Sequence, residues 1–174
     1  MRNKSKPAEE FIDGLIEHIE RHVLRQKDIL EKREGEIQRG LHPLIVEYVA
    51  DHYREAGYKN YLNKAAEVVY WEGQDAPNTE EKVSVFAARC YPDFIIREPY
   101  RIAIEYKKSN TGALVKQCIG QGMMYILSDD YDFAYLLFDD QSKDKKIRKS
   151  MARPREQSIA LRMWRDFNIK MHIL

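Results

Sequence analysis

The chain has 174 residues, which is enough for one domain with a real hydrophobic core. Hydrophobic residues make up 44% and charged residues 33%, a composition that excludes a fibrous or disordered chain and favours a globular one. Its 29 basic and 28 acidic residues leave a formal net charge of +1, so total charge alone identifies no polyanionic partner.

The chain contains two cysteines, Cys90 and Cys118, and neither belongs to a Cys-x-x-Cys pair. This count excludes a disulfide framework and argues against a structural zinc site. The five histidines are scattered and give no predicted pair of metal ligands: they are His18, His22, His42, His52 and His172. No stretch resembles a signal peptide or a membrane span, so we expect a cytoplasmic protein without membrane contact.

The first elements are predicted to be helices. Apolar residues recur every three or four positions from 8 to about 39, with Gly35 and Gly40 weakening the end. A second helix is expected from Pro43, a residue favoured in a first turn, to Gly57. We therefore divide the chain into an N-terminal helical arm (1–41) and a main domain (42–174). The arm could pack on the domain or form a homodimer through this helix.

Strands dominate the middle of the chain. Strands are expected at 65–73 and 83–90, on either side of a polar loop over 74–82. Two more strands meet at Glu98-Pro99 to form a hairpin, and a helix follows over 111–128. The glycines of that helix, Gly120 and Gly122, indicate close packing on a sheet.

The last elements alternate between strand and helix. A buried strand is expected over 131–140, then a basic loop over 141–155, a helix over 155–166 and a closing strand over 167–174. This order predicts an α/β fold with a mixed β-sheet flanked by helices on both faces.

Three charged residues interrupt the apolar pattern of the hairpin "YPDFIIREPYRIAIEYKK" (91–108). Asp93 and Glu105 are equidistant from Pro99, so an antiparallel pairing would place them opposite each other. Glu105 and Lys107 are two residues apart and share a face of their strand. Facing carboxylates repel unless a cation lies between them, and their hard oxygen atoms suit Mg²⁺. A divalent ion there could activate water beside a phosphate, with Lys107 orienting the water or balancing charge.

Pro92-Asp93 followed by Glu105-Tyr106-Lys107 resembles the motif of the PD-(D/E)xK nuclease superfamily. The resemblance covers roughly residues 42 to 140 and implies a restriction-endonuclease-like fold with an αβββαβ core, here with an added N-terminal helix. It implies that Asp93, Glu105 and the backbone carbonyl of Tyr106 bind Mg²⁺ or Mn²⁺, and that Lys107 is catalytic. Many members add a glutamate from the helix before the sheet, for which Glu47 is the best-placed match.

Some members also carry Gln-x-x-x-Tyr on the helix after the motif. Gln121 and Tyr125 fit that pattern, and Gln117 lies one turn earlier on the same stripe. We expect Gln121 to act in the catalytic site. Contacts to nucleic acid are expected from Gln117, Tyr125, Lys108 and the basic residues Lys145, Lys146, Arg148, Lys149, Arg153 and Arg155.

The sequence thus favours a metal-dependent nuclease acting on phosphodiester bonds, with DNA as the expected substrate because most of the family acts on it. Each of these residues also has a non-functional interpretation. The charged residues of the hairpin could form a surface salt-bridge cluster. Tyr125 could pack in the core, and Glu47 could lie on a solvated helix face. The rival function is a catalytically inactive protein of the same fold that binds nucleic acid or a protein partner.

Overall fold

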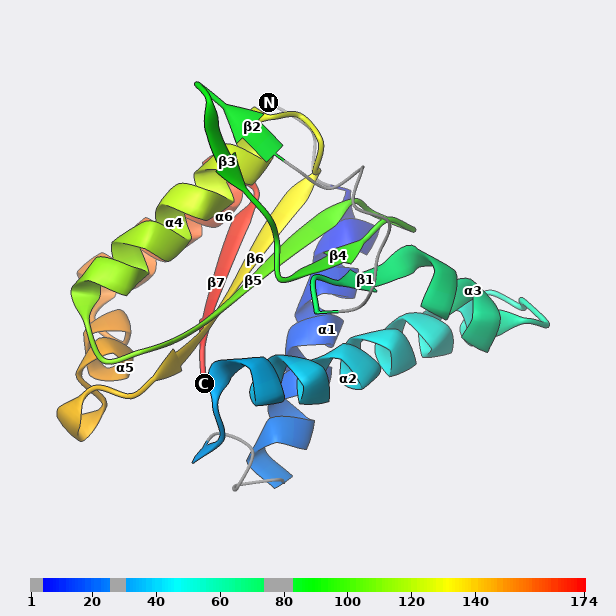
Figure 1. Ribbon diagram of the computed structural model, residues 1–174, viewed down its shortest axis with the longest axis horizontal. Helices are drawn as coiled ribbons and strands as arrows, with labels where there is room; N and C mark the ends of the chain where they lie inside the picture. Colours follow the sequence, from blue (N-terminus) through cyan, green and yellow to red (C-terminus); the bar gives the residue numbers. More distant parts are fainter. Residues whose placement is uncertain (1–4, 26–30, 74–82) are drawn as a thin grey trace.

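The computed structural model describes residues 5–25, 31–73 and 83–174. It shows an α/β protein in which a mixed, five-stranded sheet lies between helices (Figure 1). The expected fold class is confirmed at this level. The loop expected at 74–82 lies outside the described residues.

The sheet has the strand order β1-β4-β5-β6-β7. The first three strands, β1 (Val69–Trp71), β4 (Phe94–Ile96) and β5 (Ile102–Ser109), are antiparallel. β5, β6 (Phe133–Asp140) and β7 (Ile169–Ile173) run parallel, because helices connect them. Every residue of β6 is buried, as its continuous apolar sequence predicts for a central strand.

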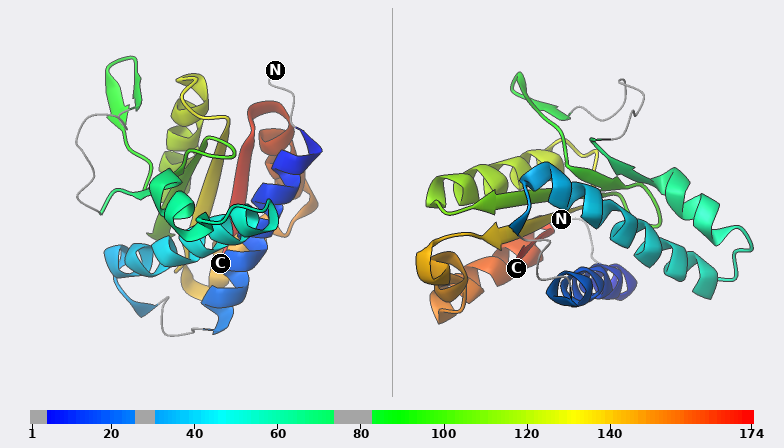
Figure 2. Two further views of the ribbon diagram at one scale, coloured as in Figure 1. Left: turned by 90° about the vertical axis from the view of Figure 1, so that its right-hand side faces the viewer. Right: turned by 60° about the horizontal axis from the view of Figure 1, so that its bottom comes forward.

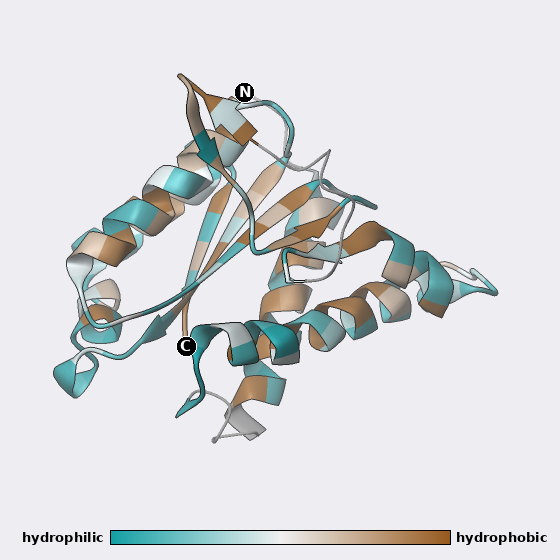
Figure 3. Ribbon diagram, in the orientation of Figure 1, coloured by the Kyte–Doolittle hydropathy of each residue, from teal (hydrophilic) through white to brown (hydrophobic). Residues whose placement is uncertain are grey.

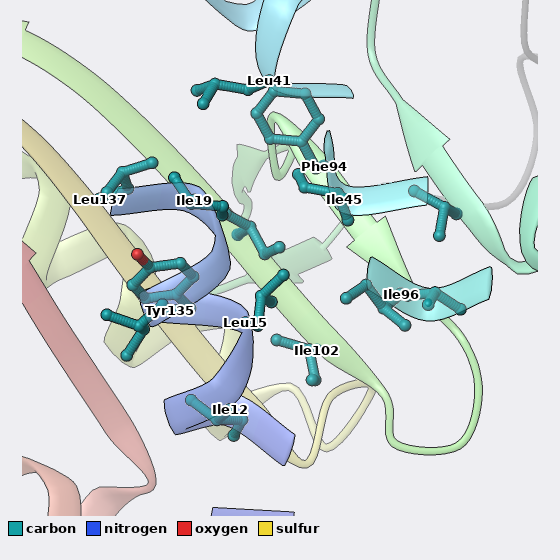
Figure 4. Packing of buried hydrophobic residues seen from close by; sticks show 14 of the residues in the cluster. Ile12, Leu15, Ile19, Leu41, Ile45, Phe94, Ile96, Ile102, Tyr135 and Leu137 are labelled. Atoms are coloured by element: carbon teal, nitrogen blue, oxygen red, sulfur yellow. The ribbon is translucent and has the colours of Figure 1, made fainter. Parts of the chain in front are cut away.

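The N-terminal helices cover one face of the sheet. α1 (Lys6–Arg25) and α2 (Glu34–Glu55) bury a shared apolar cluster against this face, and α3 (Tyr61–Val68) packs beside α2. Figure 4 shows Leu15 and Ile19 of α1 and Ile45 of α2 packed around Ile102 and Tyr135 of the sheet. The expected arm is therefore part of the main core, and the expected boundary at 41/42 falls inside α2.

The opposite face carries α4 (Gly112–Leu127), while α6 (Pro154–Phe167) lies along the β7 edge (Figure 2). Both helices were expected from the sequence, as was the close packing of one glycine. A Cβ atom added to Gly122 would lie 3.0 Å from the Leu136 side chain, whereas one added to Gly120 would meet nothing within 4 Å. Only Gly122 therefore explains how closely α4 approaches the sheet.

The predicted boundaries of the first helices are wrong. α1 ends at Arg25 and α2 begins at Glu34, where the Glu36 carboxylate accepts a hydrogen bond from the Arg33 N–H. Pro43 lies inside α2 and not in a first turn. The helix continues through it because Leu41 and Ile45, on either side, are buried in the core.

Three other elements differ from their predicted form. The expected strand 65–73 begins as the last residues of α3, and only 69–71 form a strand, β1. The expected strand 83–90 is a separate two-stranded hairpin of β2 (Val83–Val85) and β3 (Ala88–Cys90), which reverses at Phe86 and Ala87 with positive φ angles. The expected basic loop forms a 3₁₀ helix (Lys143–Lys145) and α5 (Lys146–Met151), organised by the buried Asp140 side chain, which accepts from the N–H groups of Ser142 and Arg148.

Hydropathy separates the strands, which are mostly hydrophobic, from the outer helix surfaces (Figure 3). Among the described residues, no helix is both long and apolar enough to cross a membrane.

Candidate active site

The β4–β5 hairpin has the register that the sequence predicts. Phe94 pairs with Ile104 and Ile96 with Ile102, so continuing the ladder by one residue sets Asp93 opposite Glu105. β4 begins only after Asp93, so at this position a side-chain hydrogen bond, and not strand pairing, links Asp93 to β5. The Asp93 Oδ2 atom accepts a 2.7 Å hydrogen bond from the backbone N–H of Tyr106. The two carboxylates are thereby tied to one point on β5.

Lys107 completes this group, which we call the carboxylate–lysine cluster (Asp93, Glu105 and Lys107). Its Nζ atom lies 2.7 Å from Glu105 Oε1 and 4.0 Å from Asp93 Oδ2. Asp93 is 6% exposed, Glu105 only 1%, and the Lys107 side chain 17%. This rules out the interpretation as a solvated salt bridge on an edge hairpin, since the acids are buried within the sheet.

The buried cluster contains two acids and a single lysine. Burial, and then the charge of Glu105, raise the pKa of Asp93 to about 7, although Lys107 opposes the shift. Burial alone would lower the pKa of Lys107, but Asp93 and Glu105 outweigh it and the pKa is raised. Lysine thus stays charged, and within the described ranges it is the one cation that pairs with the two acids.

Tyr125 supports the cluster from α4. Its hydroxyl group donates to Glu105 Oε2 over 2.6 Å and also lies 2.8 Å from the Tyr91 carbonyl oxygen, so one hydrogen serves two acceptors. Tyr125 is fully buried. The expected contact of Tyr125 with nucleic acid is therefore contradicted: its side chain positions Glu105 from inside the protein.

The other α4 residues differ in their access to the cluster. Gln121, one turn before Tyr125, has a buried Oε1 atom without a hydrogen-bond partner among the described residues. Gln117 is exposed on the helix surface. Cys118 is buried, and burial followed by the charge of Glu105 raises its pKa to about 12, so it remains a thiol. Of these α4 residues, Tyr125 contacts the cluster directly, through its hydroxyl group.

The helix glutamate closest to Lys107 is not the one that the sequence predicted. Glu34, at the start of α2, places its Oε1 atom 3.9 Å from Lys107 Nζ. Glu47 is 13 residues further along the same helix, about 20 Å along its axis at 1.5 Å per residue, and contacts His18 instead. The structure does not bring Glu47 to the cluster. The acidic stretch "REGE" (33–36) is a signal for a helix start that could have identified Glu34, but the predicted helices did not use it.

The basic residues lie near the same end of the sheet. Lys107 and Lys108 pair with Phe138 and Asp139 of β6, and the basic segment starts a few residues later. Its cations are all exposed: Lys145, Lys146, Arg148, Lys149, Arg153 and Arg155. The Nζ atom of Lys108 donates to the carbonyl oxygen of Lys32 over 2.7 Å, so this lysine also joins β5 to the segment before α2.

Comparisons with protein families, with curated proteins and with solved structures find no match for this chain.

Proposed function

We propose that the protein is a metal-dependent nuclease of the PD-(D/E)xK type. One observation carries the proposal: two buried carboxylates face each other on a central hairpin, and among the described residues Lys107 alone forms an ion pair with them. Burying an unbalanced charge costs several kcal/mol, so such an arrangement is retained where a ligand or a reaction needs it. A divalent cation supplies the missing positive charge.

The donor set fits a hard cation. Asp93 and Glu105 offer carboxylate oxygens, and the Tyr106 carbonyl follows on the same strand, which is the oxygen chemistry that Mg²⁺ or Mn²⁺ prefers. The Oε1 atom of Gln121 is buried, has no hydrogen-bond partner within the described part of the chain and lies one helical turn from Tyr125, so we propose it as an acceptor for a metal-bound water. When bound, the ion would polarise the phosphate and lower the pKa of a water molecule.

The protein side chains have separate roles in this proposal. Asp93 and Glu105 hold the ion, and Tyr125 fixes the orientation of Glu105. Lys107 orients the attacking water and offsets negative charge on the phosphate as the bond breaks. Glu34 stands where its carboxylate can hold Lys107 or accept a hydrogen bond from the same water.

The exposed basic segment supports nucleic acid as the substrate. Its cations follow directly from the strand beside the cluster and can neutralise phosphates on a bound strand. DNA is the substrate that we propose, on the family resemblance. The same segment also favours the second candidate, a protein that binds nucleic acid without cleaving it.

Cleavage assays separate the two candidates. Purified protein is incubated with single-stranded, duplex and branched DNA, with Mg²⁺, with Mn²⁺ and with EDTA. The nuclease proposal predicts cleavage with either ion that is lost with EDTA and in Lys107→Ala. Salt-sensitive DNA binding that ignores metal, without cleavage of any substrate, would instead favour the binding protein.

A further inference from the structure

A second cluster of metal-binding side chains lies between α1 and α2, away from the carboxylate–lysine cluster. It consists of His18 and His22 on α1 and Glu47 on α2. One ligand atom from each residue lies within 4.8 Å of the other two. The spacing of His18 and His22, one helical turn apart, was a signal in the sequence, but Glu47 reaches them only through helix packing.

The hydrogen bonds of the two histidines leave ring nitrogens available. His22 Nδ1 lies 2.8 Å from the carbonyl oxygen of His18, and because a carbonyl only accepts, Nδ1 must carry the hydrogen. This leaves the His22 Nε2 lone pair for a ligand, and an imidazole whose second nitrogen donates to a carbonyl is the usual arrangement at metal sites.

His18 is held less completely. Its Nε2 atom is buried and has no hydrogen-bond partner among the described residues, and Glu47 Oε2, at 3.7 Å, is too distant to provide one. The His18 and His22 ring centroids are 4.3 Å apart, so the two imidazoles lie close enough to bind one ion.

We infer that His18, His22 and Glu47 form a zinc site that fastens α1 to α2. Two imidazole nitrogens and one carboxylate oxygen are ligands that suit Zn²⁺ and not Mg²⁺, with water completing a four-coordinate set. In a tetrahedral set, zinc–ligand bonds of about 2.0–2.2 Å put ligand atoms about 3.3–3.6 Å apart, so side-chain rotations that bring the three ligand atoms closer together would close the site. The Glu47 side chain is 55% exposed and free to make that adjustment.

The site differs from a zinc-protease motif. The stretch is His18-Ile19-Glu20-Arg21-His22, and it has no glutamate directly after the first histidine to act as a general base. Although water would hold the fourth position, as in open zinc sites, no general base follows the first histidine, and the role that we infer is to link α1 to α2. The inference does not rest on the proposed nuclease activity.

The test measures zinc affinity by competition with a chromophoric chelator, in excess Mg²⁺ so that hard oxygen sites are blocked. Wild-type protein should bind one zinc ion, and zinc should raise its melting temperature reversibly with EDTA. His22→Ala should weaken binding by at least about 100-fold and Glu47→Gln by at least about 10-fold. Both variants should lose the rise in melting temperature.

Two substitutions on α2 serve as matched controls. Glu55→Gln removes another carboxylate, and His52→Asn removes a histidine that packs against Phe11. Both should keep wild-type zinc affinity. Bound Co²⁺ should give the strong visible absorption of a four-coordinate ion in the wild type and in both controls.

Circular dichroism without zinc checks that each variant is folded. If His22→Ala does not fold, Glu47→Gln, at an exposed position, still tests the inference. Wild-type protein that binds no zinc, or Glu47→Gln with undiminished affinity, would overturn the inference.

Discussion

The two faces of β5 carry different kinds of side chain. On one face, Ile102, Ile104 and Tyr106 are fully buried in the apolar cluster under α1 and α2. On the other face, Ala103 is followed by Glu105 and Lys107, which point toward α4. Strand alternation alone produces this division, because neighbouring residues point to opposite sides of the sheet.

The difference shows how a central strand can hold charged residues. Packing of the apolar face holds the strand in place. The polar face can therefore hold two buried acids beside one lysine, although burying their charges lowers the stability of the fold. Substitutions on the polar face should therefore change activity, and those on the apolar face should change folding. The following predictions test this division.

The largest effect is expected from the cluster itself. Asp93→Ala and Lys107→Ala should each lower the rate of DNA cleavage by at least about 10³-fold, because each removes a group that acts directly on the ion or the phosphate. Rates are measured in Mg²⁺ on the substrate that the wild type cleaves. Glu67→Gln, which removes an exposed carboxylate on α3, is the matched control and should keep full activity. Retained activity in either cluster variant would contradict the assigned roles.

On the opposite face, Ile104→Ala should lower the free energy of unfolding by about 2–5 kcal/mol, because it leaves a cavity in the core. Urea denaturation measures this change. The folded fraction of the variant should still cleave DNA at nearly the wild-type rate. If the variant were as stable as the wild type but did not cleave DNA, the assignment of this face to folding alone would be wrong.

The carboxylates should also make the metal-free protein sensitive to pH. The pKa of Asp93 is about 7 in the folded protein and 3.8 in an unperturbed chain, so between these values the folded state holds a proton that the unfolded state has lost. Stability from this group therefore falls as pH rises from about 4 to about 7 and stays low above.

Asp93→Asn removes the free-energy cost of ionising this buried carboxyl group. Without metal at pH 8 it should be more stable than the wild type by on the order of 2 kcal/mol, and the gap should close toward pH 4. Thermal unfolding at both pH values measures this, and Mg²⁺ should stabilise only the wild type. A variant that is less stable than the wild type at pH 8 would show that the acids are not in conflict.

The smallest expected effect on cleavage is that of Glu34, and it should distinguish this residue from Glu47 on the same helix. Glu34→Gln should slow cleavage by about 10-fold, the low end of what a helper to general acid–base chemistry contributes, because its carboxylate approaches Lys107. Glu47→Gln should leave cleavage unchanged at saturating zinc. Equal losses in both variants, measured in one assay, would reject the assignment of Glu34 to the site.

The sequence predicted the parts of the site that lie within one hairpin. A short turn fixes register, so the pairing of Asp93 with Glu105 and the shared face of Lys107 follow from counting residues. The contacts of Glu34 and Tyr125 could not be counted this way. They depend on where α2 and α4 settle against the sheet, which side-chain packing decides.

Two local signals were also misread for physical reasons. Pro43 usually marks a helix start, but α2 continues through it between buried neighbours, so Glu34 had been assigned to the first expected helix and not to the start of the second. Ala65 and Val68 fit a strand by composition, yet they form the buried side of α3. In both places, tertiary packing overrode local preference.

The most direct test of the carboxylate–lysine cluster is a crystal structure with Mn²⁺ and its anomalous scattering. We predict a peak between Asp93 and Glu105, about 2.0–2.3 Å from an oxygen of each, that disappears in Glu105→Ala. Crystals of the wild type in millimolar Mn²⁺ that show no peak between these carboxylates, or a peak that persists in Glu105→Ala, would contradict the account.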